Sequence, residues 1–263
     1  MGVAVEYHDA LAQLAWQIEL GADEAIGDDP LDRYDLPVAA PKPVALAPKT
    51  AAAPAAPAVV DQVDPVVVAR QMAQAAQDIA GLQAALAGFE YCDLKNGARN
   101  LVFADGKPSA PVMVIGEASS REEDTKGMPF VGAAGNLLDR MFAAIGMDRA
   151  SPEAENAIYL SNFLPWRLPQ NRDPKPDELA MLMPFVKRHV ELAEPKVVVL
   201  MGNIACQGVL GRRGITRMRG QWQEAWGRPA LPMLHPDALM KNPLAKREAW
   251  ADLLSLKEKL GRA

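Results

Sequence analysis

The chain has 263 residues, of which 49% are hydrophobic and 23% charged, a composition ordinary for a soluble globular protein of one or two domains. No apolar run approaches a membrane span, the N-terminus lacks a basic leader, and 2 cysteines exclude a disulfide framework, so we expect a cytoplasmic protein. Residues 1–88 hold 4 Lys/Arg and 12 Asp/Glu and the remainder holds 24 and 21, so the net charge of -5 hides a mildly basic C-terminal part. That part permits a nucleic-acid partner without requiring one.

The N-terminal segment predicts an appendage to a folded domain. Residues 9–26 space their apolar side chains as one short amphipathic helix, within a helical appendage that covers residues 1–36. Residues 37–62 are rich in Ala and Pro, which predicts an extended linker. For residues 1–60 two interpretations stay open, contact with a protein partner through the helix or plain disorder.

Residues 63–88 predict a single helix that leads into the domain. Asp64 supplies an N-cap and Pro65 a first-turn proline. The helical pattern then continues to about Leu86, and Gly88 ends it.

From residue 89 the pattern changes to short apolar strands that alternate with helices. We expect strands at 111–117, 157–163, 196–202 and 228–236, and helices at 133–147, 175–194, 203–211 and 243–261. This alternation predicts a three-layer α/β/α sandwich with a central, mostly parallel four-stranded sheet, over residues 89–263. In such sheets ligands bind beyond the carboxyl ends of the strands.

The loops at those ends carry a constellation of four residue types. Glu117, Phe130, Asn162 and His235 supply an acid, a stacking face, an amide and an imidazole. Each of them alone has a structural explanation, such as a cap or a buried hydrogen bond. Together they suit a planar, hydrogen-bonding ring, and a flipped nucleobase is such a ring.

The motifs that carry these residues resemble those of a known family. GEASSREEDTKGMPFVG, IYLSNFLPWRLPQNRDPKPDEL and MLHPDALMKNP stand in order and with family-like spacing. They resemble the uracil-DNA glycosylase superfamily, most closely the iron–sulfur type called family 4, over about residues 89–262. The resemblance implies a monomeric, nucleoid-associated enzyme of base excision repair that flips uracil or a related deaminated base out of DNA and hydrolyses its N-glycosidic bond. The alternative is a glycosylase-fold protein of low or no activity that binds DNA or a repair partner.

Roles follow by position from this resemblance. It assigns catalysis to Glu117 and Glu123, near the water and the sugar, and to His235, which would face uracil O2. It assigns base binding to four residues: Gly116, Ala118, Phe130 and Asn162. Phe130 would stack on the ring, and Asn162 would read its N3–H and O4 edge.

The segment after His235 matches the part of the family that enters DNA. Leu239 and Met240 are the expected apolar wedge. Lys241, Arg217 and Arg219 are the expected phosphate contacts, with an ordinary solvated surface as the alternative for each.

The sequence departs from the family at the cluster ligands. The family holds an iron–sulfur cluster through cysteines, and the matching positions here are Phe89, Cys92, Trp166 and Leu182. One cysteine cannot hold such a cluster, so we expect no cluster and no other metal or cofactor. Bulky apolar side chains are expected to fill its volume, and Cys206 is expected to be a core residue.

Ser119 and Ser120 are a second departure, since the family usually carries Pro-Gly there. A glycine at that point can adopt a positive φ, which a serine reaches only at a cost. We expect either a rebuilt loop whose hydroxyls serve the site, or an altered rate or base preference.

Overall fold

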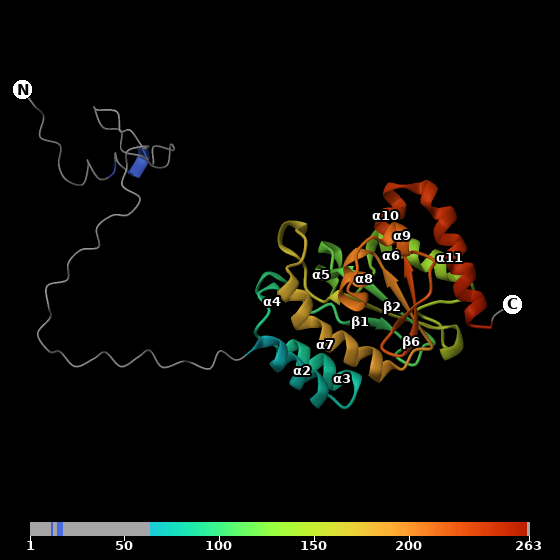
Figure 1. The fold of residues 1–263 in the computed structure, drawn as a ribbon, viewed down its shortest axis with the longest axis horizontal. Coiled ribbons are helices and arrows are strands. Elements are labelled where there is room, and N and C mark those ends of the chain that lie inside the picture. Colours follow the sequence, from blue (N-terminus) through green and yellow to red (C-terminus); the bar gives the residue numbers. More distant parts are fainter. Residues whose placement is uncertain (1–11, 13–14, 18–63, 262–263) are drawn as a thin grey trace, which may run out of the picture. The chain divides into compact units, whose positions relative to one another are not determined.

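The structure is a computed structural model that describes residues 12, 15–17 and 64–261 (Figure 1). The chain divides into two units, Met1–Ala58 and Val59–Ala263. Residues 12 and 15–17 are helical and exposed. The rest of the predicted helix at 9–26, and the linker at 37–62, lie outside the described residues. No described helix combines the length and the apolarity that crossing a membrane requires.

The domain is built on one sheet with the strand order β1-β3-β2-β4-β6-β5. Its four central strands are β2 (Val112–Ala118), β3 (Ile158–Leu164), β4 (Val197–Met201) and β6 (Arg228–Met233). All pairings among these four are parallel, so their carboxyl ends lie along one edge of the sheet. The edge strands β1 (Ala104–Gly106) and β5 (Gln223–Ala225) pair antiparallel.

The central strands are buried on both faces, as their apolar sequences predict. Met113, Ile115 and Leu200 belong to one buried cluster, whereas their neighbours Val114 and Val199 belong to another. Since side chains alternate along a strand, the two clusters lie on opposite faces. The predicted three-layer α/β/α class is therefore confirmed.

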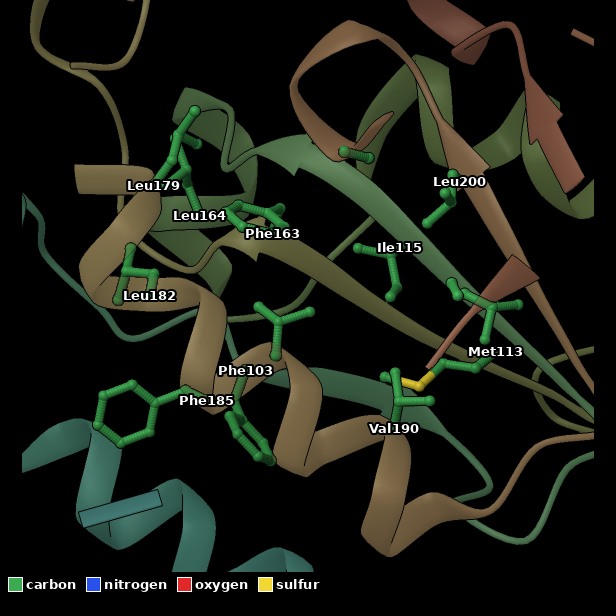
Figure 2. Packing of buried hydrophobic residues seen from close by; sticks show 14 of the residues in the cluster. Phe103, Met113, Ile115, Phe163, Leu164, Leu179, Leu182, Phe185, Val190 and Leu200 are labelled. Atoms are coloured by element: carbon green, nitrogen blue, oxygen red, sulfur yellow. The ribbon is translucent and has the colours of Figure 1, made fainter. Parts of the chain in front are cut away.

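Helices cover both faces and join the strands. They are α2 (Pro65–Ala75), α3 (Ile79–Ala87), α4 (Leu94–Gly97), α5 (Arg121–Lys126), α6 (Gly132–Ala143), α7 (Pro176–Ala193), α8 (Asn203–Leu210), α9 (Ile215–Met218), α10 (Pro236–Lys241) and α11 (Lys246–Lys259). Three short 3-10 turns lie at Ala154–Asn156, Pro169–Asn171 and Pro243–Ala245. Helix α7 packs between the sheet and the N-terminal pair α2 and α3, and Figure 2 shows Leu182 and Phe185 on it among the buried side chains.

Two expectations about the elements were wrong in detail. The sheet has six strands rather than four, because two three-residue edge strands extend it. The helix predicted over residues 63–88 is two helices, α2 and α3, separated at residues 76–78. Asp78 caps the second by accepting a hydrogen bond from Gly81 N at 2.7 Å. The caps at Asp64 and Gly88 are where the sequence placed them.

A buried histidine lies between α7 and the sheet. Nε2 of His189 is 2.9 Å from the Tyr159 hydroxyl, and the Phe103 ring stacks on the imidazole with centroids 4.5 Å apart. Burial lowers the pKa of His189 to about 3, so the folded protein holds this side chain neutral.

We therefore expect the free energy of unfolding to fall as the pH drops below the ordinary histidine pKa of about 6.5. The unfolded chain takes up a proton there and the folded chain does not, which gives a slope of up to about 1.4 kcal/mol per pH unit. Urea unfolding between about pH 7 and pH 5.5 measures the slope. His189→Gln should flatten it, and an equal slope in both proteins would contradict this assignment.

Candidate active site

A cavity of about 250 Å³ opens at the carboxyl edge of the sheet. It is lined by Ala118 at the end of β2, by α5 and its preceding loop, by the loop before α6, and by the start of α10. Glu123, Phe130 and His235 all face it. A wider groove of about 1010 Å³ adjoins this cavity. The two share the lining residues Ala118, Ser120, Arg121 and Asp237.

The backbone at Ser119 and Ser120 is unstrained, and both residues form hydrogen bonds. Ser120 is the N-cap of α5 with φ of -75°, and Ser119 is not among the residues with positive φ. Ser120 and Glu123 form a reciprocal capping box, in which each side chain accepts the other's backbone N–H. Ser119 N and Oγ both donate to Leu164 O at 3.2 Å, which ties the end of β2 to the end of β3. Neither serine therefore adopts the positive φ that a glycine would allow here, and an effect on rate or base preference stays a prediction.

Phe130 is held in a left-handed conformation with φ of 50°. Such backbone costs a non-glycine residue about 1–2 kcal/mol, and it persists where the surroundings fix it. Its N–H donates to Glu123 Oε1, and its ring stacks near the His235 ring, with centroids 5.6 Å apart at 24°. A Cβ on Gly116 would lie 2.7 Å from the Phe130 ring, so only glycine lets the ring approach this strand.

Asn162 lies one layer deeper than the open cavity. It pairs with Gly116 across β2 and β3 and is 4% exposed. Its Nδ2 is 3.4 Å from Glu123 Oε1 and 3.5 Å from Ser119 Oγ, and these two acceptors fix which way the amide points. Its Oδ1 therefore faces Gly116, where a Cβ would approach within 2.3 Å.

His235 is both the N-cap of α10 and a wall of the cavity. Its Nδ1 accepts a hydrogen bond from Asp237 N at 3.3 Å. A neutral imidazole that accepts at Nδ1 carries its proton on Nε2. The cap therefore leaves Nε2–H as a donor.

The two predicted acids have different surroundings. Glu123 is 7% exposed, and its carboxylate already accepts from Ser120 N, Phe130 N and Asn162 Nδ2, so it organises the site. Glu117 lines the groove, and Ile204 N, at the start of α8, donates to its Oε1 at 2.9 Å. Within the described residues its Oε2 has no hydrogen-bond donor.

The second cysteine lies behind Glu117, in the core. Burial raises the pKa of Cys206 to about 12, and the negative charge of Glu117 adds to the shift. Cys206 is 0% exposed and is a neutral core thiol, as predicted.

The groove carries basic side chains that the sequence did not single out. Arg121, Arg167, Arg172 and Arg213 line it together with the predicted Lys241. Arg172 pairs with Glu178 and Arg213 with Asp173. The Nε of Arg167 is buried without a hydrogen-bond partner among the described residues. For two of them, Arg167 and Arg172, the sequence signal was WRLPQNR within the motif IYLSNFLPWRLPQNRDPKPDEL, where they flank Pro169.

Two predicted DNA contacts do not fit their surroundings. Leu239 is 1% exposed and belongs to the core, so inserting it into DNA would require it to leave that core. Arg219 forms an ion pair with the buried Asp252 and donates to Glu248 O at 2.9 Å, so it holds α11 in place. Met240 is 39% exposed, and Arg217 lies on α9, beside a surface hollow that Arg213 shares.

The four cluster positions meet in one buried core. The side chains of Phe89, Cys92, Trp166 and Leu182 are between 0 and 2% exposed and belong to a single hydrophobic cluster. Phe89 packs edge-on against Phe185, and burial raises the pKa of the Cys92 thiol. No group of three or more His, Cys, Asp or Glu side chains that could hold a metal occurs in the described part of the chain. These residues do not fit an iron–sulfur cluster.

The fold and this cavity define a class, α/β/α proteins whose candidate binding site lies beyond the carboxyl ends of parallel strands. The sequence model of the uracil DNA glycosylase superfamily matches residues 103–254, and the chain belongs to that superfamily.

Curated relatives named Type-4 uracil-DNA glycosylase agree with this assignment. The chain is 35% identical to the Archaeoglobus fulgidus protein over 180 residues, 65% of this chain and 87% of that protein. It is 32% identical to the Sulfurisphaera tokodaii protein over 178 residues, 64% and 78% of the two chains. The Saccharolobus solfataricus protein is 31% identical over 181 residues, 65% and 81% of the two chains.

Proposed function

We propose that the protein hydrolyses the N-glycosidic bond of uracil in DNA. The observation that carries the proposal is that Phe130 and His235 line one cavity and that Asn162 lies one layer deeper, beside Gly116, with Glu123 hydrogen-bonded to Phe130 N and to Asn162 Nδ2. This set supplies a stacking face, a directional amide and a donor, which is the chemistry that a flipped uracil needs.

The amide sets the base preference in this proposal. Asn162 Oδ1 would accept the N3–H of uracil once the base enters beside Gly116. Cytosine has no hydrogen at N3, so it would leave this buried acceptor unpaired. Mismatches of buried polar groups discriminate strongly, because the unpaired group has lost its water.

The imidazole of His235 stabilises the leaving group in this proposal. As the N1–C1′ bond breaks, its electron pair leaves on the base, and negative charge grows on uracil O2. The Nε2–H of His235 would donate to that oxygen, as donors in an oxyanion hole do. A neutral donor suffices, because the cap at Nδ1 already fixes the tautomer.

The carboxylate of Glu117 is proposed to stabilise the sugar cation and to orient the attacking water. The sugar becomes cationic as the base departs, and water then adds its oxygen to C1′. Glu117, with Oε1 held by Ile204 N and Oε2 without a donor, is suited to orient that water. The proton that the water loses neutralises the departing base.

The enzyme works without an iron–sulfur cluster in this proposal. The core that contains Phe89, Trp166 and Leu182 supports it, because packed side chains occupy the positions where the family has its ligands. Packing then does the structural work of metal ligation, and no step of the reaction needs the metal.

The groove is proposed to carry the DNA strand. Arg121, Arg167 and Lys241 would meet its phosphates, with a salt-dependent affinity. Of the two predicted wedge residues, Met240 is 39% exposed and stays a candidate, and Leu244, which is 88% exposed, replaces the buried Leu239.

We expect Leu244→Ala to lower kcat/KM on duplex DNA by about 10-fold and to change single-strand activity little, because only a duplex leaves a stacked gap to fill. Parallel assays on uracil-containing duplex and single strands measure the ratio. Leu254→Ala is the matched control, since Leu254 is 45% exposed on α11. Equal losses on both substrates would assign Leu244 a different role.

The function itself is tested with oligonucleotides that carry a single uracil. Wild-type protein should leave an alkali-labile site at that uracil and none at cytosine. Asn162→Ala should abolish the activity while the circular dichroism spectrum stays unchanged. Binding without any product at high protein concentration would instead favour a non-catalytic DNA-binding protein.

A further inference from the structure

Phe130 lies in the loop before α6, and neighbouring groups contact its backbone on both the amide and the carbonyl side. On the amide side, the N–H donates to Glu123. On the carbonyl side, Gly135 approaches so closely that a Cβ there would lie 1.8 Å from Phe130 O. Because φ at Phe130 is 50°, the loop needs such contacts to stay in this conformation.

Arg149 completes the carbonyl side from a distant part of the chain. Its Nη2 donates to Phe130 O at 3.0 Å and its Nη1 to Pro129 O at 3.3 Å. Two carboxylates anchor the guanidinium, Asp139 at 2.8 Å from Nε and Asp105 at 2.9 Å from Nη1. The side chain is 15% exposed.

This use of the guanidinium depends on its shape. A planar fork with five fixed N–H donors can bind two carbonyls and two carboxylates at once, whereas an ammonium cannot match that geometry. The carboxylates come from β1 and from α6, so the fork joins the loop to two elements of the framework.

We infer that Arg149 is a positioning residue, which sets the plane of the Phe130 ring against the flipped base. This inference rests on the proposed function. Arg149 does not line the cavity, and among the residues to which its guanidinium hydrogen-bonds, Phe130 is the one that does, so we expect its effect on the reaction to pass through Phe130. A tilted ring would stack poorly on the base and would move it away from Asn162 and His235.

A double-mutant cycle tests the inference. Arg149→Met should lower kcat/KM for uracil release by about 10- to 100-fold, since small misplacements near reacting groups have effects of that size. In a Phe130→Ala background the same change should have less than about a twofold effect, because the group through which Arg149 acts is gone. Equal losses in both backgrounds would overturn the inference.

The matched control is Arg140→Met on α6. Arg140 is exposed, and within the described part of the chain its Nε donates to Asn136 O in its own helix, at 3.2 Å, and to no other group. It should leave kcat/KM unchanged. If Arg149→Met does not fold, Arg149→Lys keeps a charge for the carboxylates and enters the same cycle.

Amide hydrogen exchange supplies a readout that needs no activity. Arg149→Met should speed exchange at the Phe130 N–H by at least about 10-fold while the amides of β2 and β3 keep their protection. Unchanged exchange at Phe130 would overturn the inference even if the wild-type protein released no uracil. Absence of uracil release with faster exchange would count against the proposed function alone.

Discussion

Replacing His235 by alanine is expected to lower kcat for uracil release by about 10²- to 10³-fold, which corresponds to about 2.7–4 kcal/mol of transition-state stabilisation. The reason is the tautomer of His235, which carries its proton on Nε2. Nδ1 is used by the Asp237 N–H, so the proton sits on Nε2 and can meet the charge that grows on the base. Single-turnover assays on a single-stranded uracil oligonucleotide measure this step without the contribution of product release.

His235→Asp separates catalysis from helix capping. Aspartate is a strong N-cap and would keep an acceptor for Asp237 N, so α10 should stay folded. Its negative charge would oppose the charge on the leaving uracil. The aspartate variant should therefore be less active than the alanine variant. If the aspartate variant kept wild-type activity, His235 would be a cap and nothing more.

Replacing Trp166 by alanine is expected to lower the free energy of unfolding by about 3–5 kcal/mol, which is the usual loss for a buried large aromatic. Trp166 is 2% exposed in the cluster that also contains Phe89 and Leu182. Because these side chains occupy the positions of the family's metal ligands, removing one should leave a cavity in the core. Urea unfolding followed by circular dichroism measures the change.

Trp250→Ala is the matched control, because Trp250 is 43% exposed on α11. That change should stay within about 0.5–1 kcal/mol. Similar losses for both tryptophans would contradict tight packing at the positions that match the family's cluster ligands.

The central strands could be predicted because each is a short apolar run that ends at a polar loop. The edge strands could not. Ala104–Gly106 and Gln223–Ala225 have three residues each, and no alternation of side chains marks them. They form because a neighbouring strand offers unpaired backbone groups, which only the folded sheet provides. The break between α2 and α3 was readable at Asp78, a good N-cap inside an apolar pattern.

The candidate site also has features that the sequence predicts and features that it does not. Residues on strand-end loops could be predicted because topology alone brings them together. The burial and pairing of individual side chains could not be predicted, because they depend on residues that only the folded chain brings close. Leu239 is covered by the core, Arg219 is paired with Asp252 on α11, and Arg149 reaches Phe130 by way of the tertiary structure.

We propose that this member of the superfamily releases uracil with a packed core at the positions of the family's metal ligands. The most direct test measures iron content, visible absorption and uracil release in one preparation purified without oxygen. We expect active enzyme with iron well below one atom per chain and without the visible absorption of an iron–sulfur cluster. Stoichiometric iron that is lost together with activity on chelation would show that the protein depends on a cluster.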